Sequence, residues 1–245
     1  MVFNITECVD FHHGKRIVIT ILVCGHDVVI IMHKEGDALL IQQPVYYPFR
    51  EVIEDNGRIF VNNQLHYEDG KYTIDFEDFE KKIVDNNVKV FILCNPHNPV
   101  GRVWTKERTG EMGDICLKHN VVIMDDEIHC DFTYPGFKFT SFMTLDEKYH
   151  NSLVLYTSPS KTFNVAGLQP ANIIIKNPEL RAAYRKANAA AGYSQGSIMG
   201  QVAVKSVYTK GDEWVNELVE YITGNMNYMR DFVKENFPKA HFVDS

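Results

Sequence analysis

The sequence lacks the features that would place a protein outside the ordinary globular class. It has no long basic run, and its 25 lysine and arginine residues are outnumbered by 32 aspartate and glutamate residues, for a net charge of −7. Such an acidic chain is a poor candidate for binding nucleic acid or an anionic membrane surface. Because apolar residues make up 45% of the chain and charged residues 23%, overall disorder, collagen and coiled coil are excluded.

Cysteine and long apolar runs are also scarce. The five cysteines are an odd number at irregular spacings, without a Cys-x-x-Cys pair. We therefore expect neither a disulfide framework nor a zinc site, and the composition favours a cytoplasmic protein. The apolar run at residues 17–24 is interrupted by Gly25 after eight residues. A membrane-spanning helix needs roughly 20, so we expect this run to be a buried helix or strand and predict no membrane segment.

What the sequence does contain is an alternation of apolar, β-rich runs with helical stretches. Most of the runs are continuously apolar, which is typical of strands covered on both faces by helices in a parallel sheet. The pattern predicts an α/β fold with three layers around one mostly parallel central sheet. The predicted strands are Leu39–Gln43, Arg58–Asn62, Val88–Cys94, Val121–Asp125, Leu153–Ser158 and Asn172–Lys176.

Helix boundaries are predicted from residues that favour helix ends. Asp75 and Thr105 are suitable N-caps, and Pro178 suits the first turn of a helix. Pro238 is expected to stop the last helix, whose apolar residues Trp214, Leu218, Tyr221 and Ile222 share one face. The predicted helices are Phe76–Asn86, Lys106–His119, Pro178–Ala190 and Asp212–Asn236.

Reactive side chains follow four of the predicted strands. Ligands bind such sheets beyond the carboxyl ends of the strands, so these side chains are expected to share one site. A lysine can form a Schiff base, a carboxylate can hold a pyridine nitrogen protonated, and an aromatic ring can stack on a flat cofactor. In chain order the four segments are residues 44–48, 95–102, 126–129 and 157–164, which present an aromatic ring, an amide, a carboxylate, and a cluster of two hydroxyls and a lysine. The set suits a flat, anionic cofactor that bears a carbonyl group.

Three of these stretches, residues 94–107, 126–129 and 158–169, also resemble a known family. They are similar to the fold-type I enzymes that use pyridoxal 5′-phosphate (PLP), the aminotransferase class I/II superfamily. The chain looks most like the cystathionine β-lyases of the MalY/PatB type. The resemblance extends from about Gly36 to Tyr208, and the three stretches occur in the family's order, each at a strand end.

The resemblance implies a division of the chain into three parts. Residues 36–209 would form the PLP-binding large domain, residues 1–35 a divergent N-terminal segment packed on it, and residues 210–245 a connecting helix and the start of a small domain. The family's small domain carries an arginine for the substrate carboxylate, and we expect that domain to be largely absent here. Thr20 stands where a glycine is expected in the family's phosphate-binding loop. Because family sites form between two subunits, the resemblance also implies a homodimer.

The resemblance assigns roles to the residues of the Schiff-base turn and its carboxylate partner. Lys161 matches the lysine that binds the cofactor aldehyde and later takes the Cα proton of the substrate. Asp126 matches the carboxylate that pairs with the pyridinium nitrogen, whereas Asp125 is interpreted as structural. Ser158 and Ser160 match phosphate-binding hydroxyls.

The remaining assignments concern the cofactor ring. Asn98 matches the donor to the ring's 3-hydroxyl oxygen, and Asn95 is interpreted as a turn residue. Tyr46 matches the stacking aromatic residue, with Tyr47 as the competing choice. His129 either touches the cofactor or is a packed histidine behind it.

Gln169 favours one subfamily. It stands eight residues after the lysine, where typical aminotransferases have an arginine that pairs with the phosphate and the β-lyase subgroup has glutamine. We therefore predict a PLP-dependent carbon–sulfur β-lyase that cleaves cystathionine or related cysteine S-conjugates to thiol, pyruvate and ammonia. A class I/II aminotransferase and a truncated, catalytically impaired family member are the two alternatives.

Overall fold

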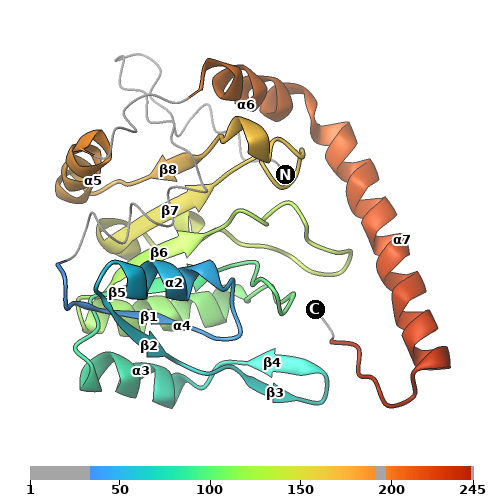
Figure 1. Cartoon of the computed structure of the whole chain (residues 1–245), viewed down its shortest axis with the longest axis horizontal. Helices are drawn as coiled ribbons and strands as arrows, with labels where there is room; N and C mark the ends of the chain where they lie inside the picture. The colour runs from blue at the N-terminus through green and yellow to red at the C-terminus, as the bar shows by residue number, and fades with distance from the viewer. Residues whose placement is uncertain (1–33, 191–196, 244–245) are drawn as a thin grey trace.

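The structure is a computed structural model of the chain and describes residues 34–190 and 197–243 (Figure 1). The expectations for residues 1–33, including Thr20, lie outside the described residues. The main sheet has six strands in the order β2-β1-β5-β6-β7-β8, all parallel except that β8 is antiparallel to β7. The strands are β1 (Ala38–Ile41), β2 (Ile59–Asn62), β5 (Val90–Cys94), β6 (Val122–Asp126), β7 (Leu153–Thr157) and β8 (Asn172–Ile174).

All six predicted strands are present, and each end lies within two residues of the predicted bound. The predicted first strand continued to Gln43, but β1 ends at Ile41. The backbone N–H of Gln43 donates to the side-chain Oδ1 atom of Asn62 at 3.0 Å and not to a strand carbonyl, and the side-chain amide of the buried Gln42 donates to the Oδ1 atom of Asn63 at 2.9 Å. The mostly parallel arrangement is therefore confirmed, and only the exact ends of the strands had to be determined from the structure.

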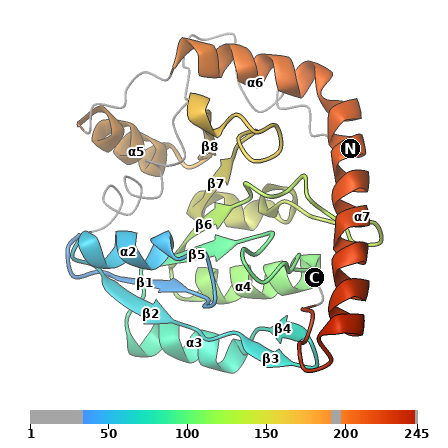
Figure 2. The same ribbon diagram turned by 45° about the vertical axis from the view of Figure 1, so that its right-hand side comes forward.

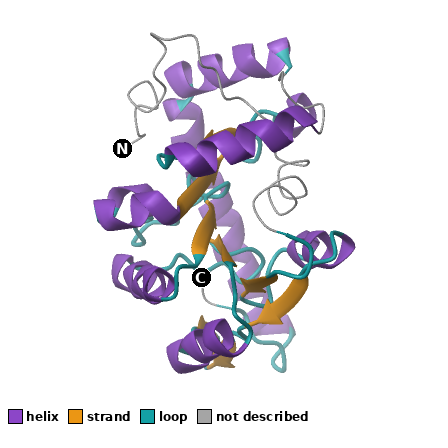
Figure 3. Ribbon diagram, turned by 90° about the vertical axis from the view of Figure 1, so that its left-hand side faces the viewer, coloured by secondary structure: helices purple, strands orange, loops and turns teal. Residues whose placement is uncertain are grey.

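Helices cover both faces of the main sheet, so the three-layer prediction is confirmed (Figure 3). Side chains of β5 alternate, because Val90 and Ile92 belong to one buried cluster whereas Phe91 and Leu93 belong to the other. Each such side chain contributes about 1.5–3 kcal/mol when fully buried. Residues of α2 (Pro48–Asp55) and α5 (Pro178–Ala190) complete the first cluster, and residues of α3 (Phe76–Asp85) and α4 (Lys106–Lys118) complete the second.

Both predicted N-caps are confirmed. The side chain of Asp75 accepts a hydrogen bond from the backbone N–H of Asp78 at 2.9 Å, and Thr105 accepts one from Arg108 at 3.3 Å. These bonds satisfy backbone donors that the first turn of a helix leaves free. The predicted helices correspond to α3, α4, α5 and α7 (Asp212–Asn236).

Several short elements were not predicted. They include the hairpin of β3 (His66–Glu68) and β4 (Lys71–Thr73), whose side chains are mostly exposed and show no apolar run. Its turn residues Asp69 and Gly70 have positive φ, so the Asp-Gly pair was the available hairpin signal. The other unpredicted elements are α2, α6 (Ile198–Lys210) and the 3₁₀ helices η3 (Phe142–Thr144), η4 (Glu147–Ser152) and η5 (Ala166–Leu168).

Helix α7 runs along one side of the molecule, from α6 toward the β3–β4 hairpin (Figure 2). None of its 25 residues is buried. Trp214 and Tyr221 are 49% and 69% exposed, whereas Leu218 and Ile222 are half-buried. None of the helices in the described ranges is long and apolar enough to cross a membrane.

His97 joins two turns at the carboxyl edge of the sheet. Its Nε2 atom lies 3.0 Å from the carbonyl oxygen of Pro44, and the indole N–H of Trp104 donates to its Nδ1 atom at 3.4 Å. Because an indole can only donate, Nδ1 is the acceptor and Nε2 carries the proton. Burial lowers the pKa of His97 to about 4, so the ring is neutral at physiological pH. The turn before Tyr46 is thereby tied to the turn that holds Asn98.

We expect His97 to make the stability of the protein fall in acid. Its ordinary pKa of 6.5 applies in the unfolded chain, which therefore takes up a proton between pH 6.5 and 4 that the folded chain does not. Because of this difference, the free energy of unfolding should fall by roughly 3 kcal/mol as the pH is lowered from 6.5 to 4. In His97→Gln, which retains a donor and an acceptor, urea denaturation at several pH values should show a correspondingly shallower fall. Parallel curves for the two proteins would contradict the assignment.

Candidate functional site

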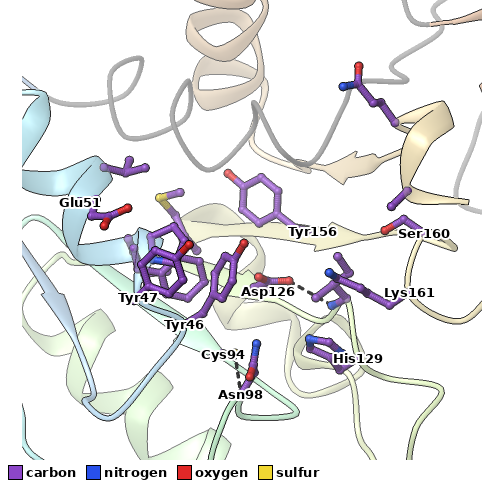
Figure 4. A pocket seen from close by; sticks show the side chains of 18 of the residues that line it. Tyr46, Tyr47, Glu51, Cys94, Asn98, Asp126, His129, Tyr156, Ser160 and Lys161 are labelled. Carbon is purple, nitrogen blue, oxygen red and sulfur yellow. Dashed lines mark hydrogen bonds between the residues drawn. The ribbon is translucent and has the colours of Figure 1, made fainter. Parts of the chain in front are cut away.

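A cavity of about 360 Å³ opens at the carboxyl ends of β1, β5, β6 and β7 (Figure 4). Six of the seven residues predicted for the site line it. They are Tyr46, Asn98, Asp126, His129, Ser160 and Lys161. Gln169 lines it as well. The prediction that the ends of these strands meet at one place is therefore confirmed, and the side chains of a lysine, a carboxylate, an amide and an aromatic ring share one cavity.

Asp126 is the last residue of β6, and its Oδ1 atom accepts a hydrogen bond from the N–H of Ile128 at 3.1 Å. Burial raises the pKa of this carboxyl to about 6, although the Ile128 N–H and the positive charge of Lys161 act in the opposite direction. A pKa of about 6 leaves the group mostly ionised at neutral pH, in a cavity lining that also contains the apolar side chains of Met124 and Ile128. A cation bound beside it would lower its pKa and hold it in the charged form.

Asp125 points to the other face of the sheet, where it is fully buried. Burial and then the neighbouring Glu127 carboxyl raise its pKa. Glu127 in turn accepts a hydrogen bond from the N–H of Phe142 at 2.8 Å, which closes the base of the loop after β6. Adjacent aspartates thus occupy different environments, because successive strand residues point to opposite faces.

The turn after β7 presents Lys161 to the cavity. The hydroxyl of Ser158 accepts a hydrogen bond from the N–H of Ser160 at 2.9 Å and donates to the carbonyl of Pro170 at 2.5 Å. Ser158 is therefore occupied in bracing the turn and does not line the cavity, in contrast to Ser160. Lys161 itself is exposed (Figure 4).

Tyr46 lies between Tyr47 and Asp126 in the cavity (Figure 4). Its ring makes an edge contact with Phe49, with 5.6 Å between the ring centroids, and is 38% exposed. Tyr47 also lines the cavity but is 71% exposed. Of the two rings, Tyr46 is thus the one held more firmly by its neighbours, and it is also the one predicted to stack on a cofactor.

His129 and Asn98 line the cavity from the loops after β6 and β5. Burial, and to a smaller extent the charge of Lys161, lowers the pKa of His129. A lowered pKa keeps its ring neutral at physiological pH. The backbone N–H of Asn98 donates to the Sγ atom of Cys94 at 3.4 Å, which fixes this loop against the end of its own strand.

Sequence reasoning missed the lining residues that lie inside the strands. Ile92 and Cys94 come from β5, Met124 from β6 and Tyr156 from β7. Residues two apart in a strand point to the same face of the sheet. Met124 could therefore have been predicted as a lining residue, because it lies two positions before Asp126 in β6. Burial raises the pKa of the Cys94 thiol, so this cysteine stays protonated and packs as a small buried side chain.

The donor set suits PLP. A primary amine for an aldehyde, a carboxylate for a pyridinium nitrogen, an aromatic face and an amide surround a space of small-molecule size. A metal site has no comparable basis, because no cluster of three or more His, Cys, Asp or Glu side chains suited to a metal ion occurs among residues 34–190 and 197–243.

Comparison with known proteins agrees with this geometry. Cystathionine beta-lyase PatB of Bacillus subtilis is 42% identical over 208 residues, which cover 85% of this chain and 54% of the relative. Among solved structures, cystalysin from Treponema denticola, which contains a pyridoxal 5′-phosphate cofactor, superposes with a TM-score of 0.89 at 37% identity. The match covers 91% of this chain and 57% of that one.

A PLP-bound C-S lyase from Staphylococcus hominis is similar as well, with a TM-score of 0.87 at 31% identity over 97% of this chain and 60% of that one. The chain thus spans about half the length of the curated relatives it matches. The sequence pattern of the family described as Aminotransferase class I and II matches residues 24–242, which is most of the chain. The protein belongs to the aminotransferase class I and II family.

Proposed function

We propose that the protein is a PLP-dependent carbon–sulfur β-lyase that acts on cystathionine or a related cysteine S-conjugate. The observation that carries the proposal is that Lys161 and Asp126 line one cavity, close enough for the charge of the lysine to lower the pKa of the carboxyl (Figure 4). Gln169, which replaces the arginine of typical aminotransferases, favours elimination over transamination. The similarity to a cystathionine beta-lyase and to the structure of a PLP-bound C-S lyase supports the same choice.

In this proposal Lys161 and Asp126 divide the proton chemistry. Bound PLP supplies an electron sink next to the substrate Cα. The Asp126 carboxylate keeps the proton on the pyridine nitrogen, which makes the ring electron-withdrawing. The Lys161 amine would take the proton from Cα as a general base, and loss of the thiolate from Cβ followed by hydrolysis would give thiol, pyruvate and ammonia.

The other residues bind and orient. Tyr46 would stack on the ring, Asn98 would donate to its 3-hydroxyl oxygen, and Ser160 would contribute to phosphate binding, with Ser158 bracing the same turn. We further propose that His129 contacts the cofactor in its neutral form. The assignment of residues 36–209 as the cofactor-binding domain, a homodimeric assembly and a cytoplasmic location belong to the same proposal.

Incubation of the full chain with PLP and cystathionine should release pyruvate and a new thiol in equal amounts. Coupled lactate dehydrogenase and a thiol reagent measure the two products. Transfer of the amino group to the cofactor without thiol release would instead indicate an aminotransferase. Neither product from protein that has bound PLP would indicate the catalytically impaired alternative.

Replacing the lysine should abolish covalent cofactor binding. Addition of PLP to the wild-type chain is expected to produce a visible absorbance band that borohydride makes permanent and that maps to Lys161 by peptide mass. Lys161→Ala should give no such band, whereas the matched control Lys81→Ala, at an exposed position of α3, should behave as wild type. A persistent band in Lys161→Ala would disprove the assignment.

Neutralising the carboxylate should weaken catalysis more than binding. Asp126→Asn keeps the size of the side chain but cannot hold the ring nitrogen protonated, so we expect kcat to fall by about a hundredfold or more. Asp126→Glu retains the charge and should lose less. Steady-state pyruvate formation by the three proteins tests this order, and a kcat of Asp126→Asn equal to that of wild type would contradict it.

A further inference from the structure

The turn that carries Lys161 is held from outside the cavity by its next residue. Thr162 is 1% exposed, and its hydroxyl donates to the Oδ2 atom of Asp131 at 2.7 Å. The two residues are 31 positions apart, and Asp131 belongs to the loop after β6. A hydrogen bond to an ionised acceptor is about twice as strong as one between neutral groups. The bond therefore ties the β6 loop to the β7 turn one residue from the reactive amine.

The start of helix α7 holds the same turn through its backbone. The indole N–H of Trp214 donates to the carbonyl oxygen of Thr162 at 3.4 Å. Gly211, one residue before α7, packs so closely on the ring of Phe163 that a Cβ atom there would overlap it. The side chain and the carbonyl of Thr162 thus have partners from two different elements.

The residues before Lys161 are fixed as well. The N–H of Ser160 is bonded to Ser158, and the N–H of Val165 donates to the carbonyl of Ser160 at 3.1 Å. The backbone is consequently held on both sides of Lys161, and the lysine side chain extends from this fixed turn into the lining of the cavity. The same β6 loop carries His129, two residues before Asp131, on the cavity side.

We propose that Thr162, held by Asp131 and Trp214, is a positioning residue that sets where the Lys161 amine lies between Asp126 and His129. The proposal rests on the catalytic role of Lys161 in the proposed function. Proton transfer from Cα requires the amine within hydrogen-bonding reach, and a misplacement of about 1 Å can cost on the order of a hundredfold in rate. A threonine that only stabilised the fold would change the unfolding midpoint and leave the properties of Lys161 unaltered.

Thr162→Val and Thr162→Ser separate these possibilities. Valine has nearly the same shape without the hydroxyl, whereas serine keeps the hydroxyl and therefore the bond to Asp131. The first measurement uses the full chain without added cofactor. The rate at which an amine reagent labels Lys161 is followed by peptide mass spectrometry, with Lys81 of the same digest as an internal reference.

We expect labelling of Lys161 to be at least about threefold faster in Thr162→Val, because the released turn lets the amine spend more time in solvent. Thr162→Ser should stay within about twofold of wild type, and Lys81 should be labelled equally in all three proteins. Trp214→Phe, which removes the indole donor, should raise the rate in the same direction. Equal labelling of Lys161 in wild type and Thr162→Val would overturn the proposal.

The second measurement uses PLP-loaded protein. With the substrate that wild type cleaves, kcat should fall by about ten- to a hundredfold in Thr162→Val while KM changes less than about threefold, and serine should restore kcat. If wild type binds PLP but has no lyase activity, the proposed function fails while the labelling result still decides the role of Thr162. Should Thr162→Val not fold, Asp131→Asn, which weakens the acceptor, takes its place in both measurements.

Discussion

The two-sided burial of the sheet is the constraint on which the site depends. The central strands have helices on both faces, so their side chains are committed to one of two apolar clusters. Ionisable groups therefore gather where the strands end, and the parallel order of β1, β5, β6 and β7 puts these ends at one edge. The cavity is a consequence of this arrangement, because the residues just after each strand lie outside the two apolar clusters and line the space at this edge.

The same constraint explains which features were readable from the sequence. Runs of mostly apolar residues indicated all six strands. Asp75 and Thr105 marked helix starts because capping depends on local geometry alone. The β3–β4 hairpin was missed since it contributes almost nothing to the core and has no apolar pattern. The lining residues Cys94, Met124 and Tyr156 were missed because their relevance depends on which face of each strand meets the cavity, and this is decided by packing between distant segments.

Ser158 shows where a sequence assignment needs the structure. Its spacing from Lys161 agrees with a phosphate-binding role, yet its hydroxyl is bonded within the turn to Pro170 and Ser160. Conversely, Thr162 carries no sequence signal, because the acceptor Asp131 is on another loop. Residues that hold a reactive group in place are selected by contacts over long sequence separations, whereas the reactive group itself is recognisable from its neighbours in the chain.

Helix α7 has a different consequence. Its 25 residues bury no side chain, and its contacts with the rest of the described chain include the bond of Trp214 to the Lys161 turn. Its backbone amides are therefore protected from exchange with solvent deuterium mainly by the hydrogen bonds of the helix itself. Amides of the central strands, in contrast, exchange only when the hydrophobic core unfolds. The amides of α7 therefore belong to a unit that opens at a lower free energy than the central strands, although its first turn is bonded to the turn that carries Lys161.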